Sequence, residues 1–144
     1  IVADFGCGYG YLSSQVAQHC PAISMLYMLD ADARALSCAQ ANLEGVRPGL
    51  GVQALWTDLT IAHDAFADQF DVIVMNPPFH EGKKTDIGVG ISFIECAHTA
   101  LKKDGRLYMV ANTHLPYEHV LQTLFKNVRK IYEGGGFKVF EAFV

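Results

Sequence analysis

The chain has 144 residues, of which 51% are hydrophobic and 18% charged, with a formal net charge of −4. This length and apolar content suit one domain with a single core and exclude a disordered chain, while the net negative charge argues against a free-standing nucleic-acid binder. No apolar run approaches the ~20 residues that a membrane helix needs, and no signal peptide precedes the first strand-like residues, so we expect a cytoplasmic protein without a membrane partner.

Strand-like and helix-like segments alternate along most of the chain. Short apolar runs predict strands at residues 1–5, 23–29, 52–56, 70–75, 107–111, 128–132 and 137–143. Apolar residues at helical spacing predict helices at residues 11–19, 33–43, 91–101 and 117–125. Pro21 stops the first helix, Asp32 is expected to cap the second, and the lysines at 102–103 suit the end of the third. We expect a loop at residues 80–90 and a turn at residues 103–105.

Three consecutive glycines, residues 134–136, join the last two expected strands. Such a tight link can join only antiparallel neighbours. The alternation and this hairpin together predict an α/β fold: a doubly wound, mostly parallel seven-stranded sheet with a C-terminal antiparallel hairpin. Because the chain opens without methionine inside a strand-like run, we expect residues 1–144 to be the C-terminal catalytic domain of a longer protein.

The two halves of the chain differ in charge. Residues 1–71 contain two arginines and eight acids, a net charge of −6, whereas residues 72–144 contain nine bases and seven acids, a net charge of +2. The mild positive bias therefore lies in the second half, which by itself does not indicate RNA binding. The four cysteines, at positions 7, 20, 38 and 96, have no metal-ligand spacing and are expected to be reduced structural thiols, with no metal site.

The first candidate site is the sequence Asp-Phe-Gly-Cys-Gly-Tyr-Gly at residues 4–10, between the first strand and the first helix. Gly6, Gly8 and Gly10 let the backbone turn sharply and approach a ligand closely. A dinucleotide fingerprint has the spacing Gly-x-Gly-x-x-Gly, whereas this spacing is Gly-x-Gly-x-Gly. Asp4 is a poor neighbour for a pyrophosphate and suits a ligand with an ammonium and a sulfonium. The pattern favours S-adenosylmethionine over NAD; a turn required only by packing is the third interpretation.

Two aspartates follow predicted strands, where ligands bind to open α/β sheets. Asp30 ends the second strand, where a carboxylate can accept hydrogen bonds from both hydroxyls of a ribose. This pairing also occurs with NAD, so it indicates an adenosine ligand without choosing between the two cofactors; a helix cap is the alternative. Asp58 ends the third strand and can accept from the adenine amino group, with Leu59 beside the ring, or can simply form a turn.

The second candidate site is the Asn-Pro-Pro-Phe sequence at residues 76–79, directly after the predicted strand 70–75. The prolines end the strand and hold Asn76 in an extended, rigid turn. The Asn76 side-chain oxygen and the Pro77 carbonyl can accept the two hydrogens of an exocyclic amine and favour a pyramidal nitrogen aimed at a methyl donor. Phe79 would stack on a planar substrate. These residues predict methyl transfer to an exocyclic amine or an amide nitrogen.

Together, these motifs resemble the class I S-adenosylmethionine-dependent methyltransferases, which have a Rossmann-like fold. Four segments narrow the resemblance to the ribosomal RNA small subunit methyltransferase C family and its large-subunit relatives: residues 76–82, 111–112, 115–117 and 136–139. That family methylates N2 of a guanine in ribosomal RNA, with the base extruded from its stack.

The resemblance implies roles for individual residues and a substrate. Asp30 and Asp58 would bind the ribose and the adenine, and Asn76, Pro77 and Phe79 would hold the guanine. The substrate would be ribosomal RNA or a ribosomal subunit. In that family a degenerate methyltransferase-like domain lies upstream, so we expect RNA affinity to need a further domain.

Two other functions fit parts of the sequence. Release-factor glutamine methyltransferases use Asn-Pro-Pro-Tyr for an amide; Phe79, the following His80 and the segment 136–139 count against this reading. A non-catalytic cofactor-binding or RNA-docking module is the other alternative. The presence of Asn76 and of the glycine loop argues against a non-catalytic module, because an inactive copy should lose these residues first.

Overall fold

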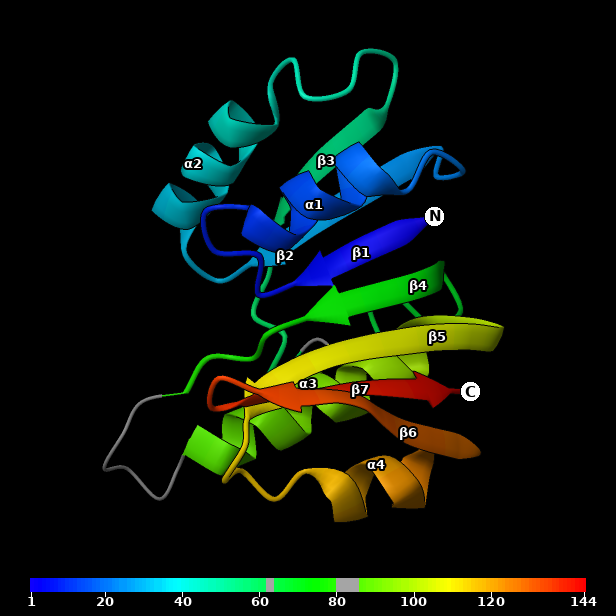
Figure 1. Cartoon of the computed structure of the whole chain (residues 1–144). Coiled ribbons are helices and arrows are strands. Elements are labelled where there is room, and N and C mark those ends of the chain that lie inside the picture. Colours follow the sequence, from blue (N-terminus) through cyan, green and yellow to red (C-terminus); the bar gives the residue numbers. More distant parts are fainter. Residues whose placement is uncertain (62–63, 80–85) are drawn as a thin grey trace.

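The computed structural model describes residues 1–61, 64–79 and 86–144 and consists of one sheet flanked by helices (Figure 1). The strands are β1 (Val2–Phe5), β2 (Met25–Asp30), β3 (Gly51–Trp56), β4 (Phe70–Met75), β5 (Leu101–Asn112), β6 (Asn127–Gly134) and β7 (Phe137–Phe143). The helices within the described ranges are α1 (Tyr11–His19), α2 (Ala33–Leu43), α3 (Asp86–Ala100) and α4 (Glu118–Leu124). None of these helices is both long and apolar enough to cross a membrane.

The seven strands lie in the order β3-β2-β1-β4-β5-β7-β6. Strands β1 to β5 pair in parallel, and β7 runs antiparallel to both β5 and β6. This arrangement confirms the predicted mostly parallel sheet with a C-terminal antiparallel hairpin. The chain winds one way from β1 to β3 and the other way from β4 onward, so the carboxyl ends of β1 and β4 flank the switch point where such sheets bind ligands.

The C-terminal hairpin turns through two glycines. β6 ends at Gly134, and Gly135 and Gly136 have φ angles of 61° and 83°. Two successive positive φ angles are typical of a type I′ turn, whose twist matches that of the paired strands. The turn brings the start of β7 beside the end of β5, where Phe137 pairs with Asn112.

Different helices cover the two faces of the sheet, each over its own apolar core (Figure 1). Successive residues of a strand point to opposite faces, so Val2 belongs to the core under α1 and α2, whereas Ala3 and Phe5 belong to the core under α3 and α4. In β2, Met28 and Leu29 divide in the same way. Burial on both faces explains why the central strands are continuous apolar runs.

Helix α3 begins at Asp86, whereas the sequence predicted a start at residue 91. Gly88 and Gly90 lowered the local helical propensity. Gly90 lies tightly under the buried Tyr117, since a Cβ at this glycine would come 2.1 Å from Tyr117 Oη. Packing between distant segments therefore accounts for this glycine. Of the predicted loop at 80–90, residues 86–90 are helical, and residues 80–85 lie outside the described part of the chain.

Strand β5 begins at Leu101, directly after α3, and not at residue 107 as predicted. The expected turn at 103–105 lies within the strand: Asp104 has a φ of 63°, and the pairing with β4 shifts register after Phe70. Lys102, expected at a helix end, is a strand residue whose Nζ lies 3.2 Å from Asp71 Oδ1. The remaining predicted elements start and end within two residues of the observed bounds.

Candidate active site

The glycine loop joins β1 to α1 and bends over the end of β2. Gly6, Gly8 and Gly10 all have positive φ angles, of 69°, 54° and 92°. The N–H groups of Gly6 and Cys7 both donate to the Leu29 carbonyl, at 2.8 and 3.0 Å. The backbone at these three positions is therefore held in a conformation that residues with a side chain rarely adopt. This confirms that the sharp turn depends on glycine.

The three glycines differ in what surrounds them. A Cβ at Gly6 would come 2.9 Å from Phe93 Cε2, and one at Gly10 would come 3.1 Å from the Ala39 Cβ, so both positions need glycine for packing as well. A Cβ at Gly8 would meet no protein atom within 4 Å. Gly8 lines two cavities, so the space beside it is open to a ligand.

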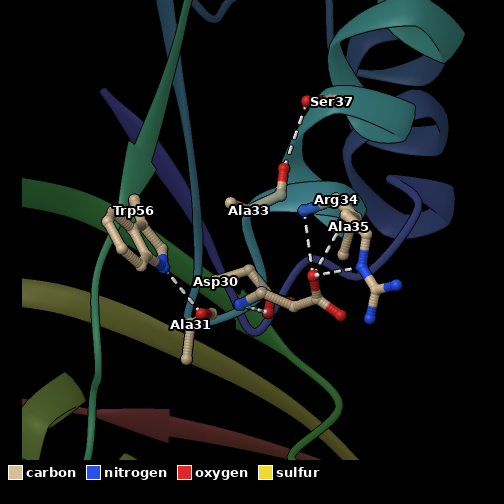
Figure 2. A network of polar contacts seen from close by, with 8 residues as sticks. Asp30, Ala31, Ala33, Arg34, Ala35, Ser37 and Trp56 are labelled. Atoms are coloured by element: carbon tan, nitrogen blue, oxygen red, sulfur yellow. Dashed lines mark hydrogen bonds and ion pairs between the residues drawn. The ribbon is translucent and has the colours of Figure 1, made fainter.

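Asp30 lies at the end of β2 beside this open glycine. Its Oδ2 accepts from the Gly8 N–H at 2.9 Å, and its Oδ1 accepts from the Asp32 N–H at 2.9 Å. An ionised carboxylate has about four acceptor positions, so two remain for ligand hydroxyls. Helix capping, the alternative role, belongs to Asp32, whose Oδ1 accepts from the N–H groups of Arg34 and Ala35. Figure 2 labels Arg34 and Ala35 at the start of the helix.

The first cavity has a volume of about 360 Å³ and lies at the carboxyl ends of the central strands. Its lining comes from the segments at the ends of β1, β2, β3 and β4 and from helix α3. The lining residues are Gly6, Gly8, Asp30, Ala31, Thr57, Asp58, Leu59, Thr60, Asn76, Pro78, Val89 and Phe93. The structure thus brings Asp30 and Asp58 together with the glycine loop and Asn76. Val89 and Phe93 were missed, because the residues around them were expected to form a loop and a helix with no site.

Asp58 lies at the rim of this cavity and also forms a turn. Its Oδ1 accepts from the Thr60 N–H at 2.9 Å and from Thr60 Oγ1 at 2.6 Å. These two hydrogen bonds hold the pKa of Asp58 below its ordinary value. Both sequence interpretations of Asp58 are therefore compatible with its geometry. Leu59 beside it is buried and supplies an apolar wall.

The second cavity has a volume of about 380 Å³ and lies on the β5 and β7 side of the glycine loop. It shares Gly6, Gly8 and Asn76 with the first cavity, so the two adjoin. Its other lining residues are Asp4, Cys7, Tyr9, Tyr11, Leu12, Val110 and Phe137. Tyr11 was missed as a lining residue. Phe137 lies in the segment 136–139 that contributed to the family resemblance, but its place beside the glycine loop could not be predicted, because the two segments are far apart in the sequence.

Asp4 is 1% exposed and lines this second cavity. Its Oδ2 accepts from the Ser13 N–H at 3.0 Å and from Ser13 Oγ at 2.6 Å, whereas Oδ1 is buried without a hydrogen-bond partner among the described residues. Burial raises the pKa of Asp4 to about 6, and the hydrogen bonds from Ser13 offset part of this rise. An unpartnered buried carboxylate oxygen is costly, and a cationic ligand group would satisfy it.

Cys7, in the glycine loop, lines the same cavity. Burial, together with the nearby carboxylates of Asp4 and Asp30, raises the pKa of its thiol to about 12. The thiol is therefore protonated at neutral pH and is no nucleophile. Burial also raises the pKa of Cys96, to about 11. Both side chains behave as small apolar groups, as the sequence predicted.

The Asn-Pro-Pro-Phe turn follows β4; some of its residues line the cavities and the others pack against the protein. Asn76 is exposed and lines both cavities, Pro78 lines the first, and Pro77 is buried. Phe79 is half-buried and contacts His114 edge to face, with ring centroids 5.5 Å apart and planes at 71°. Within the described residues, Pro77 and Phe79 are not part of the lining of either cavity. The partner His114 was missed, since it comes from the connection after β5. His80, considered beside Phe79, lies outside the described residues.

Comparison with known proteins agrees with this arrangement. The sequence matches the family described as methyltransferase small domain over residues 1–141. It is 37% identical to ribosomal RNA small subunit methyltransferase C of Sodalis glossinidius, covering 98% of this chain and 39% of the relative. It is 34% identical to ribosomal RNA large subunit methyltransferase G of Shewanella amazonensis, covering 98% of this chain and 37% of the relative. The chain thus spans less than half the length of these curated relatives.

A solved structure is similar over the whole chain. The T. thermophilus 16S rRNA N2 G1207 methyltransferase RsmC, in complex with AdoMet and guanosine, superposes with a TM-score of 0.82 at 31% identity. The match covers 99% of this chain and 36% of that protein. The sheet order, the glycine loop and the family match over 1–141 lead to one assignment. This chain belongs to the methyltransferase small domain family.

Proposed function

We propose that this chain is the catalytic domain of an S-adenosylmethionine-dependent methyltransferase that acts on N2 of a guanine in ribosomal RNA. The observation that carries the proposal is the position of Asn76, which lies where the two cavities meet. A methyl transfer needs the acceptor nitrogen held close to the donor methyl group and in line with the bond that breaks, and Asn76 can reach both spaces. The similarity to a guanine-N2 methyltransferase bound to AdoMet and guanosine supports the choice of cofactor and base.

The first cavity would hold the adenosine part of S-adenosylmethionine. In this proposal Asp30 accepts from the ribose hydroxyls, Asp58 accepts from the adenine amino group, and Leu59 packs on the ring. Gly8, where no Cβ fills the space, would leave room for the rest of the cofactor, and Oδ1 of Asp4 would hold its ammonium group. When bound, S-adenosylmethionine supplies a methyl group on a positively charged sulfur.

Asn76 and Pro77 would orient the acceptor nitrogen. The amide oxygen of Asn76 and the carbonyl oxygen of Pro77 accept the two hydrogens of the exocyclic amine, which turns the nitrogen lone pair toward the methyl group. A bond forms between nitrogen and the methyl carbon as the carbon–sulfur bond breaks, and the nitrogen then loses a proton to solvent. Orientation supplies much of the rate, because well-placed partners reach effective molarities of roughly 10⁵ M or more.

Phe79 would stack on the guanine, and His114 holds its ring in place through the edge-to-face contact. The guanine must leave its stack to reach this turn, as bases do in enzymes that modify them. The substrate would be ribosomal RNA or a ribosomal subunit, so the protein would work in the cytoplasm. We infer that RNA affinity needs a further domain, because the similar methyltransferases are more than twice as long.

Methyl transfer from tritiated S-adenosylmethionine tests this function. The full-length protein would be offered small and large ribosomal subunits, naked ribosomal RNA and translation release factors in parallel. We expect label in ribosomal RNA and, after digestion, in N2-methylguanosine. Label on a release factor would instead support glutamine-amide methylation, and absence of label from every RNA would overturn the proposal.

A further inference from the structure

Three aromatic side chains are exposed around the second cavity. Tyr9 is 65% exposed, Tyr11 is 58% exposed and Phe137 is 45% exposed, and all three line that cavity. They come from three different elements: Tyr9 lies in the glycine loop, Tyr11 is the first residue of α1, and Phe137 is the first residue of β7. We call these three side chains the aromatic rim.

The backbone under each ring is fixed. The carbonyl of Tyr9 accepts from Asn42 Nδ2 at 2.8 Å, which ties the glycine loop to α2. Tyr11 begins α1, and Phe137 pairs with Asn112 of β5 and Gly134 of β6. Exposed aromatic rings on a fixed backbone bind a planar partner with little loss of conformational entropy, because each ring has only two rotatable bonds.

The rim is continuous with the proposed reaction centre. The cavity it surrounds also contains Asn76, the residue assigned to the acceptor amine. Asp4, proposed to hold the ammonium group of the cofactor, is buried in this cavity, whereas Asn76 and the rim are exposed. A base that reaches Asn76 from solvent therefore carries its neighbouring nucleotides past the rim. Among the described lining residues Asp4 is the charged one, and it is 1% exposed, so this surface presents no exposed carboxylate to a phosphate backbone.

Resting on the proposed function, we propose that the aromatic rim is a binding site for the unpaired nucleotides that flank the target guanine. The rings of Tyr9, Tyr11 and Phe137 stack on the flanking bases, and the tyrosine hydroxyls can hydrogen-bond to ribose or phosphate oxygens. Base–aromatic stacking tolerates any sequence, because every base has a π face. The rim therefore holds the strand in place and leaves the choice of guanine to other parts of the protein.

A second protein segment is the competing occupant, and the position of the rim argues against it. A segment seated on all three rings would cover the cavity that leads to Asn76. Unpaired RNA, by contrast, must cross this rim whenever its base enters the cavity. If RNA occupies the rim, removing the tyrosine rings weakens RNA binding. If a protein segment occupies it, RNA affinity does not depend on those rings.

The test uses the full-length protein and a short oligouridine RNA with one guanosine next to a 2-aminopurine nucleotide, whose fluorescence falls on stacking. We expect Tyr11→Ala and Tyr9→Ala each to weaken RNA binding by about fivefold or more and to reduce the fluorescence quench. Tyr11→Phe and Tyr9→Phe retain the ring and should retain the quench. Val52→Ala removes a 38% exposed apolar side chain from the distant edge strand β3 and should bind RNA like the wild type.

The outcomes separate this inference from the proposed function. If the alanine variants bind RNA as tightly as Val52→Ala, or if they lose affinity for S-adenosylmethionine instead, the aromatic rim is not an RNA site. If unaltered protein methylates ribosomal RNA in that case, the proposed function stands without the rim. If the alanine variants lower the melting temperature and leave RNA affinity unchanged, the rim packs against protein and the inference is wrong.

Discussion

The backbone N–H of Gly8 donates a hydrogen bond to Oδ2 of Asp30 over 2.9 Å. This bond joins the loop after β1 to the end of β2, across the strand pair at the centre of the proposed cofactor site. It orients the carboxylate toward the first cavity and helps to fix the one glycine of the loop whose Cβ position is open. The geometry of the loop and the position of the carboxylate therefore depend on each other.

Asp30→Ala should weaken S-adenosylmethionine binding by about 1–3 kcal/mol, because a partly buried carboxylate would lose its partners in the ribose and the loop. Asp32→Ala is the matched control: it removes the α2 cap and should cost about 1 kcal/mol of stability while leaving cofactor affinity close to wild type. Calorimetric titration measures the cofactor affinity of each variant, and denaturant titration measures its stability. Equal affinity of Asp30→Ala and wild type would refute the ribose assignment.

Trp56 gives a second readout of the same binding event. It is the chain's single tryptophan, and its Nε1 donates to the Ala31 carbonyl at 2.7 Å, next to Asp30 (Figure 2). Ala31 and Thr57 line the first cavity, so a ligand there lies close to the indole. We expect S-adenosylmethionine to change the intrinsic fluorescence of the wild type and to leave that of Asp30→Ala unchanged at the same concentration. A fluorescence change of equal size in both proteins would contradict a site at Asp30.

Gly8→Ala should block the cofactor more than it destabilises the fold. A Cβ at Gly8 meets no protein atom within 4 Å, so the folding cost is the strain of a φ of 54°, about 1–2 kcal/mol. Gly45→Ala is matched, since Gly45 has a φ of 72°, is equally open and lies at the end of α2. We expect similar losses of thermal stability, with about a tenfold or larger loss of cofactor affinity for Gly8→Ala alone. The same affinity in the two variants would mean that no ligand passes over Gly8.

Asp4 should make stability depend on pH. Its pKa is raised from 3.8 in the unfolded chain to about 6 in the fold, so the folded state binds the extra proton between these values. Stability contributed by this carboxyl therefore falls as pH rises from about 4 to 6, by on the order of 3 kcal/mol, and is level above that range. Asp4→Asn, which keeps an acceptor for Ser13, should remove this slope from denaturant titrations. A slope unchanged by the substitution would assign it to other groups.

The same residue predicts a pH dependence of cofactor binding. A cationic ligand group beside Oδ1 favours the ionised carboxylate, so binding should release a proton near pH 6 and affinity should rise between about pH 5 and 7. Calorimetry in two buffers of different ionisation enthalpy measures the released proton. Affinity that is flat over this range in the wild type would separate Asp4 from the ligand.

The sequence predicted the elements whose ends are set locally. Helix α2 begins as expected because Asp32 caps it and ends just before Gly45, whose φ is 72°. The β6–β7 hairpin follows from its glycines. Helix α3 and strand β5 were placed too late, because Gly90 fits only against Tyr117 and Leu101 is a strand residue only when paired with Phe70. Short-range patterns carry no information on such distant contacts.

The residues of the candidate site also fall into two groups, those that the sequence predicted and those that depend on distant contacts. The glycine loop, Asp30, Asp58 and Asn76 were predicted as separate strand-end positions, and the parallel sheet brings them to one edge. The contact of Phe79 with His114 and the aromatic rim depend on connections that are far apart in the sequence. Tyr9 and Phe137 lie in stretches that the sequence analysis had selected, but no short-range pattern places them beside one cavity. Tyr11 and His114 carried no signal of their own.

The central claim is that Asn76 holds a guanine amine for methylation, and Asn76→Ala tests it most directly. The measurement is the yield of N2-methylguanosine from digested ribosomal RNA, together with S-adenosylmethionine affinity, for the full-length wild type, Asn76→Ala and Asn127→Ala. Asn127 is exposed at the start of β6, at the opposite end of the sheet, and its variant should behave as wild type. We predict that Asn76→Ala loses transfer by about 10²-fold or more while cofactor affinity is nearly unchanged. N2-methylguanosine at the wild-type rate from Asn76→Ala, or a methyl group on a different atom from the wild type, would contradict the account.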